Sequence, residues 1–148
     1  MSMFCYQCQE AGGNVGCTDG GVCGKDPGTA NLQDLLVWQL KGLAYVGQLA
    51  KEAGITDEET SVFVAESLFS TITNVNFDPE WFEERIREAQ VRRGALRAEY
   101  EAVEGEVDDA ALPAAATWTG DDREDFYEKA AAPEIGVLAT EDEDIRSL

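Results

Sequence analysis

Residues 29–44, TANLQDLLVWQLKGLA, carry leucines at intervals of three and four positions, which is the spacing of one face of an α-helix. This face consists of Leu32, Leu35, Leu36, Leu40, Leu43 and Ala44. Thr29 is the predicted N-cap, and Gly54 is the predicted stop because glycine readily adopts the left-handed conformation that ends many helices. Since Gln39 and Lys41 interrupt the apolar run, the sequence predicts an amphipathic helix rather than a membrane span.

A second helix is predicted after residues 56–59, TDEE, where Thr56 and Glu59 form a capping-box pattern. The predicted apolar face of this helix consists of Val62, Ala65, Phe69 and Ile72. Asn74 is a suitable residue to close the helix in a left-handed conformation.

The sequence DPEWF starts a third predicted helix, with Asp78 as N-cap and Pro79 at the first helical position. Its apolar stripe consists of Trp81, Phe82, Ile86, Ala89, Leu96 and Tyr100. Gly94 interrupts the stripe at a cost of about 1 kcal/mol relative to alanine. Because the connections between the three helices are short, consecutive helices are predicted to be antiparallel neighbours. The predicted fold class is therefore all-α, with an up-down-up three-helix bundle over residues 29–104.

The two flanking segments differ from this bundle. Residues 1–28 hold all four cysteines and many of the glycines, which predicts a glycine-rich loop ordered by something bound to it. Residues 105–148 are acidic and less regular, with a short helix expected between Gly120 and Pro133. The capping pattern of Thr140 and Glu143 predicts the start of a helix, and the apolar residues Ile145 and Leu148 fit one face of it. The sequence stops at this point. We therefore expect one domain that is truncated before a second bundle.

The overall charge excludes several classes of function. The 148 residues contain 11 basic and 30 acidic side chains, a net charge of −19, so nucleic acid and anionic membranes are not expected partners. The absence of histidine excludes histidine-based catalysis and histidine metal ligands within this chain. The N-terminus has no basic segment followed by an apolar one, so we expect a cytoplasmic protein rather than a secreted one.

Cys5, Cys8, Cys17 and Cys23 form a C-x2-C-x8-C-x5-C pattern, and three chemistries compete for it. Two disulfides are disfavoured in a reducing compartment. A structural zinc ion would suit the first pair but not the five-residue gap of the second. An iron–sulfur cluster, whose ligand sulfurs are spread around a larger object, suits uneven spacing and glycines that let N–H groups approach sulfur. Interleaved Phe4, Tyr6, Val15 and Val22 would exclude water or simply pack locally. Lys25, close to Cys23, would either offset the charge of a cluster or be solvated, and a solvated lysine is the commoner case.

The segment MFCYQCQEAGGNVGCTDGGVCGKDPGTANLQDLL, together with ATWTGDDRED and IGVLATEDEDIRSL, resembles the hybrid-cluster proteins, also called prismane proteins or hydroxylamine reductases. The resemblance implies that Cys5, Cys8, Cys17 and Cys23 hold a 4Fe–4S cluster, as in family members with this short spacing. It also implies an all-helical N-terminal domain of two three-helix bundles, followed in the full-length protein by two α/β domains.

The resemblance further implies a redox function. The 4Fe–4S cluster would take single electrons from a reductase or ferredoxin-like donor and pass them to a hybrid 4Fe–2O–2S cluster, which reduces hydroxylamine or nitric oxide. The ligands of that second cluster lie in the remaining domains, so no catalytic residue is assigned and this chain alone is not expected to be active. The alternative is a zinc-stabilised helical interaction domain without a redox role.

Overall fold

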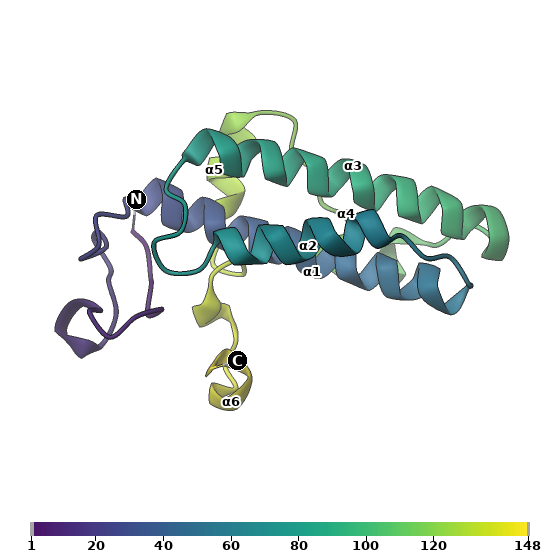
Figure 1. The fold of residues 1–148 in the computed structure, drawn as a ribbon. Coiled ribbons are helices and arrows are strands. Elements are labelled where there is room, and N and C mark those ends of the chain that lie inside the picture. Colours follow the sequence, from purple (N-terminus) through teal and green to yellow (C-terminus); the bar gives the residue numbers. More distant parts are fainter. Residues whose placement is uncertain (1, 148) are drawn as a thin grey trace.

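The computed structural model describes residues 2–147, and this part of the chain contains helices, loops and no strand. The helices are α1 (Pro27–Glu52), α2 (Glu58–Ser70), α3 (Pro79–Glu104), α4 (Ala114–Thr117), α5 (Arg123–Ala130) and α6 (Glu143–Ser147), with short 3-10 turns η1 (Gly12–Asn14), η2 (Asp109–Ala111) and η3 (Val137–Ala139). Figure 1 shows α1, α2 and α3 running antiparallel in sequence order. The predicted all-α class and up-down-up bundle are confirmed.

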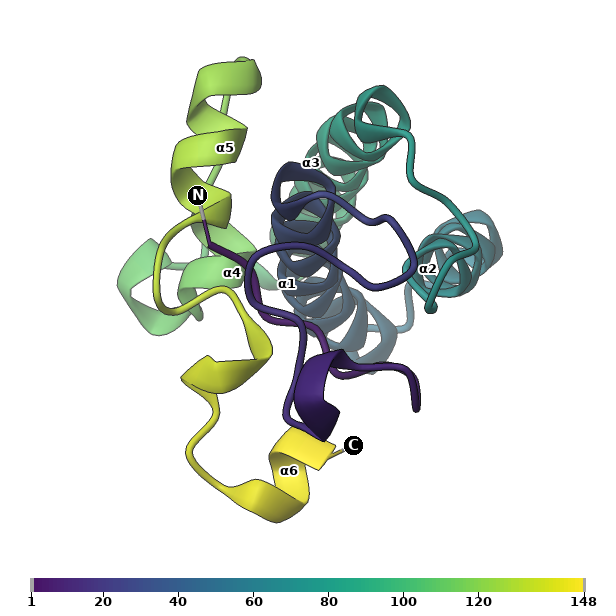
Figure 2. The same ribbon diagram turned by 90° about the vertical axis from the view of Figure 1, so that its left-hand side faces the viewer.

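Helix α1 lies at the centre of the molecule, between α2 and α3 on one side and α4 and α5 on the other (Figure 2). The leucines of its predicted face are confirmed as buried, Leu32, Leu35 and Leu36 completely, whereas Ala44 of that face is exposed. The predicted N-cap Thr29 is wrong. The helix begins earlier, at Pro27, because the Asp26 carboxylate accepts a hydrogen bond from the backbone N–H of Thr29 at 3.0 Å.

Helix α3 follows its sequence prediction closely. Asp78 caps it by accepting from the backbone N–H groups of Glu80 and Trp81, and Pro79 is the first helical residue. Phe82 and Ile86 are fully buried against α1. The helix continues through the position of Gly94, so the one unfavourable residue does not end it.

The prediction for α2 is wrong in three respects. Its N-cap is Asp57 rather than Thr56, and the left-handed residue after it is Thr73, with φ of 44°, rather than Asn74. The predicted apolar face is exposed to solvent, with 63% of Phe69 accessible. The residues that α2 buries are Thr60, Phe63, Ser67 and Ser70. Helix α2 therefore presents to the bundle a mostly polar face with a single aromatic residue.

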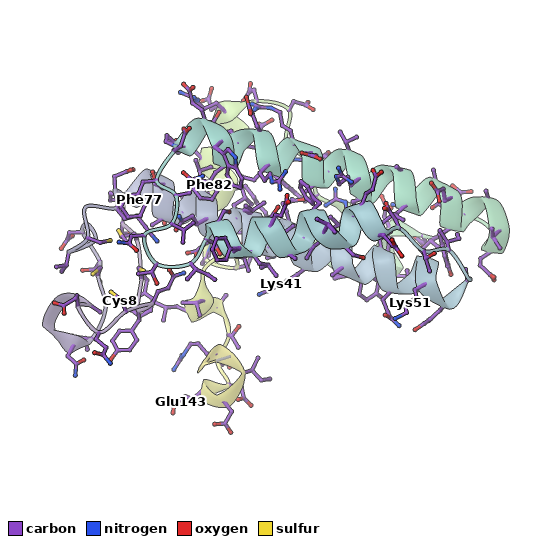
Figure 3. The ribbon with its side chains drawn as sticks, in the orientation of Figure 1. Cys8, Lys41, Lys51, Phe77, Phe82 and Glu143 are labelled. Carbon is purple, nitrogen blue, oxygen red and sulfur yellow. The ribbon has the colours of Figure 1, made fainter. Side chains whose placement is uncertain are left out.

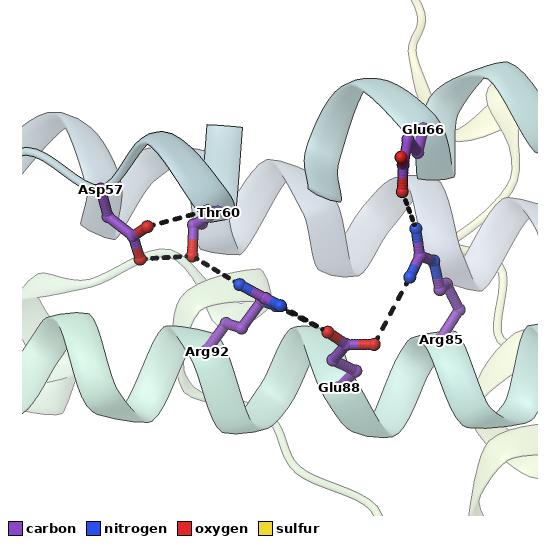
Figure 4. A network of polar contacts seen from close by, with 6 residues as sticks. All are labelled: Asp57, Thr60, Glu66, Arg85, Glu88 and Arg92. Atoms are coloured by element: carbon purple, nitrogen blue, oxygen red, sulfur yellow. Dashed lines mark hydrogen bonds and ion pairs between the residues drawn. The ribbon is translucent and has the colours of Figure 1, made fainter. Parts of the chain in front are cut away.

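Charged side chains attach α2 to α3 (Figure 4). The chain of contacts runs through Asp57, Thr60, Arg92, Glu88, Arg85 and Glu66. Arg85 pairs with Glu66 of α2 at 2.8 Å, and Arg92 pairs with Glu88 at 2.7 Å. The guanidinium groups of both arginines also lie over the ring of Phe63, at 4.3 and 4.7 Å from its centroid. Cation–π contacts thus add to the ion pairs at the α2–α3 contact.

Helix α4 approaches α1 so closely that only a glycine fits between them. A β-carbon on Gly42 would lie 1.8 Å from the carbonyl oxygen of Ala115. The buried guanidinium of Arg93, on α3, donates to that same oxygen at 2.7 Å, to Gln39 Oε1 at 2.9 Å and to the carbonyl oxygen of Trp118 at 2.6 Å. One side chain therefore joins α3, α1 and α4, and its burial lowers the pKa of Arg93.

The C-terminal segment forms two further helices. The predicted helix between Gly120 and Pro133 is confirmed as α5, which starts with a capping box. In α6 the cap is Asp142, whose carboxylate accepts from Asp144 and Ile145, so the predicted cap Thr140 is wrong. Leu148, the end of the predicted apolar stripe, lies outside the described residues. Within residues 2–147, no helix combines the length and apolar character needed to cross a bilayer.

Candidate metal centre

The four cysteines lie in the loop that precedes α1, at the end of the bundle marked by Cys8 and Phe77 in Figure 3. Two contacts hold this loop to the helices. Asn31 of α1 donates its side-chain amide to the carbonyl oxygen of Ser2 at 3.0 Å, and the backbone N–H of Thr73 donates to Gln7 Oε1 at 2.7 Å. The loop is therefore anchored both to the start of α1 and to the connection between α2 and α3.

Cys5 and Cys17 face each other across the loop. The backbone N–H of each donates to the carbonyl oxygen of the other, at 3.0 and 2.9 Å, which makes an isolated antiparallel bridge. Met3 extends the pairing by donating to the carbonyl oxygen of Thr18 at 3.0 Å. Although 12 positions separate the two cysteines in the sequence, the backbone places them side by side.

The environment of Cys17 favours its thiolate. The pKa of this thiol is lowered by the backbone N–H groups of Val22 and Gly12, and to a smaller degree by the charge of Lys25, against the opposing effect of burial. The Gly12 N–H lies 3.4 Å from Cys17 Sγ. Because the thiolate is the form that binds metals, Cys17 is prepared to act as a ligand.

Cys8 and Cys23 lie in the two turns of the loop. Cys8 is half-buried, and its carbonyl oxygen accepts from the N–H of Ala11 at 3.3 Å, just before η1. Cys23 is exposed, and its sulfur lies 3.0 Å from where a β-carbon on Gly21 would be. A side chain at position 21 would therefore push against the thiol of Cys23.

The structure places the four predicted ligands in one loop as free thiols. Within residues 2–147 no group of three or more histidine, cysteine, aspartate or glutamate side chains is arranged to hold a metal ion. The donor set itself fits an iron–sulfur centre: it offers four thiols, one of them with two backbone N–H groups directed at its sulfur.

The apolar residues between the cysteines do not cover them in this structure. Tyr6, Val15 and Val22 are all exposed, Val15 at 75%. Phe4 packs instead on the loop backbone, because a β-carbon on Gly16 would lie 2.6 Å from its ring. Of the two interpretations of these residues, local packing fits Phe4 and also Tyr6, whose hydroxyl donates to Asn14 Oδ1 at 3.2 Å.

Lys25 differs most from its sequence prediction. It is only 3% exposed, and its ammonium donates to Gln33 Oε1 at 2.6 Å. Gln33 is also buried, and it donates in turn to the carbonyl oxygen of Asn76 at 2.9 Å. The sequence shows that Lys25 lies two residues after Cys23, which is a sign that it is near the site. The sequence does not show that α1 and the α2–α3 connection enclose it.

A pH dependence is expected from Asp34, which lies on α1 near the segment at Gly136. Burial raises the pKa of Asp34 from 3.8 to about 6, although the charges of Lys25 and Lys41 oppose the shift. Between about pH 4 and pH 6 the folded chain therefore binds more protons than the unfolded chain. Its free energy of unfolding should fall by about 2 kcal/mol across that window from this one group as pH rises. Denaturant unfolding of the Asp34→Asn variant should lack this contribution, and parallel pH curves for variant and wild type would contradict it.

Comparison with known proteins finds relatives that are described as hydroxylamine reductases. The chain is 52% identical over 153 residues to a hydroxylamine reductase of Halothermothrix orenii, and 50% identical over 148 residues to one of Thermoanaerobacter pseudethanolicus. It is 51% identical over 150 residues to one of Nitratidesulfovibrio vulgaris. These alignments cover 99–100% of this chain but only 26–27% of each relative, so the chain spans about a quarter of their length.

The resemblance found in the cysteine loop and the C-terminal motifs thus extends over all of the sequence. A family model described as Prismane/CO dehydrogenase matches residues 3–148, which includes the four cysteines and every helix. Because the match covers nearly the whole chain, the chain belongs to the Prismane/CO dehydrogenase family.

Proposed function

We propose that this chain is the iron–sulfur module of a hydroxylamine reductase, with Cys5, Cys8, Cys17 and Cys23 as ligands of a 4Fe–4S cluster. The observation that carries the proposal is the family match over residues 3–148, combined with four free thiols in one anchored loop. The lowered pKa of the Cys17 thiol supports it, because a ligand sulfur must be deprotonated.

The residues of the loop would perform two tasks. The thiols bind the metal, and the backbone N–H groups of Gly12 and Val22 offset negative charge at the sulfur of Cys17. When bound, a 4Fe–4S cluster supplies reversible storage of one electron. In this proposal a reductase or ferredoxin-like donor delivers electrons to this module in the cytoplasm. Reduction of hydroxylamine or nitric oxide would require a hybrid cluster, whose ligands would lie in the roughly three quarters of such relatives that this chain does not cover.

The first test is metal content after anaerobic purification. We expect a brown protein with about four iron and about four sulfide per chain, whereas a protein that binds zinc alone is colourless because Zn²⁺ is d¹⁰. Replacing Cys17 with alanine should remove most of the iron. The matched control is Val15→Ala, an exposed position in the same loop, which should keep wild-type iron. One zinc and no sulfide per wild-type chain would overturn the proposal in favour of a zinc-stabilised domain.

A further inference from the structure

Lys25 closes the cysteine loop and is enclosed on two sides. Its side chain is 3% exposed, and the hydrogen bond to Gln33 ties it to α1. Its ammonium also lies 5.7 Å from the centroid of the Phe77 ring, in the connection before α3. Its carbonyl oxygen accepts from the N–H of Gly21 at 2.8 Å, so the same residue also shapes the turn that carries Cys23.

The charge of Lys25 has no close carboxylate partner in the described part of the chain. None of the ion pairs formed by residues 2–147 includes it, and its direct polar contact is the neutral amide of Gln33. The charge of Lys25 acts on Asp34, but the two form none of the ion pairs among residues 2–147. Burying a cation without a direct ion-pair partner is unfavourable, so such a residue calls for a further anion nearby.

The turn of the ligand loop brings Lys25 and Cys23 close together. A β-carbon on Gly21 would lie 3.0 Å from Cys23 Sγ and 3.1 Å from the β-carbon of Lys25, so Cys23 and Lys25 flank the same glycine. The side chain of Lys25 thus starts beside the predicted ligand Cys23.

We propose that the Lys25 ammonium is the counter-charge for the anionic iron–sulfur centre of the cysteine loop and raises its reduction potential. The inference rests on the proposed function. One electron taken from an external reductant makes the centre more negative by one charge, and a fixed cation stabilises the more negative state. Lys25 is in this role a positioning and electrostatic residue and not a catalytic one.

The test is a redox titration of the iron-loaded chain with Lys25→Met, Lys25→Arg and Lys41→Met. The methionine variant should shift the ratio of oxidised to reduced centre about tenfold toward oxidised at a fixed potential, which for one electron is about 59 mV. Lys25→Arg should restore most of the wild-type value. Lys41→Met removes the same charge from an exposed site on α1 and should change the ratio less than about twofold, as expected for a solvent-screened charge. An unchanged midpoint reduction potential of the iron-loaded Lys25→Met variant would overturn the role proposed for Lys25 and would leave the proposed function intact.

Two further readouts separate an electrostatic role from a structural one. If Lys25 serves only to hold Gln33, the metal-free Lys25→Met variant should unfold at a lower denaturant concentration than metal-free wild type. That result, together with an unchanged midpoint reduction potential of the iron-loaded variant, would contradict the proposal. If the methionine variant takes up no iron but Lys25→Arg does, the charge is needed for assembly, which supports it. Failure of both variants to take up iron would indicate a packing role and overturn it. Absence of iron from the wild-type chain would instead overturn the proposed function, and this inference with it.

Discussion

Replacing Gly42 with alanine is expected to separate α4 from α1 and to lower the free energy of unfolding by about 3 kcal/mol. The new β-carbon would lie 1.8 Å from the carbonyl oxygen and 2.3 Å from the carbonyl carbon of Ala115. Both are backbone atoms, so no side-chain rotation relieves the overlap, and the helices themselves must move. Denaturant unfolding followed by circular dichroism would measure the loss, and tryptophan fluorescence would report the displacement of Trp118.

The same helix offers a matched control for this prediction. Gly47 has no atom within 4 Å of its would-be β-carbon, and it also lies in the interior of α1. Gly47→Ala should therefore raise the free energy of unfolding by about 1 kcal/mol, the usual helix-propensity difference. The two substitutions are chemically identical and should have opposite signs. If Gly42→Ala is as stable as Gly47→Ala, the close contact of α1 with α4 is not present in solution.

Replacing Arg93 with methionine should cost about 3–5 kcal/mol, because it leaves buried acceptors without a donor. Three oxygens lose their partner: Gln39 Oε1 and the carbonyl oxygens of Ala115 and Trp118. The change also breaks a side-chain link that joins α3 to both α1 and α4. The free energy of unfolding measured with denaturant, at constant slope, would check the prediction.

The neighbouring arginine provides the comparison. Arg92 is half-buried and pairs with Glu88, so Arg92→Met should cost only about 1 kcal/mol. A second variant, Arg93→Lys, keeps a positive charge but not the planar group that reaches three acceptors, and it should recover only part of the loss. Equal free energies of unfolding for Arg92→Met and Arg93→Met would show that the buried guanidinium of Arg93 stabilises the fold no more than the half-buried one of Arg92.

Where the sequence predicted the fold correctly, apolar side chains made the contacts. Leu32, Leu35 and Leu36 of α1 and the Phe82–Ile86 face of α3 are buried as their periodicity indicates. Local capping signals were less decisive. Thr29 and Asp26 are both good N-cap residues, and the structure selects Asp26 because Pro27 is compatible with the first turn.

The face of α2 could not be predicted from hydrophobic periodicity. The helix contacts α3 through Phe63, Thr60 and the arginine–carboxylate network, and the apolar face predicted for it is exposed. The roles of Gly42 and Arg93 could not be predicted from the sequence either. Their roles depend on α4, which lies about 70 positions after Gly42 in the sequence, and no local pattern in α1 or α3 records that contact.

The location of the candidate site could be predicted from the sequence, but its surroundings could not. Four cysteines within 19 positions of a chain that has no others identify the loop. The pairing of Cys5 with Cys17 and the enclosure of Lys25 depend on how the loop returns to α1 and to the α2–α3 connection. These are tertiary contacts that a short motif does not encode.

The central position of α1 has a consequence for how the protein is made. Synthesis proceeds from the N-terminus, so α1 leaves the ribosome before α3 and well before α4 and α5, which cover its two sides. The side of α1 that faces α4 and α5, which includes Trp38, therefore stays uncovered until α5, which ends at Ala130, has left the ribosome. Nascent chains of intermediate length should be the species that aggregate or recruit chaperones.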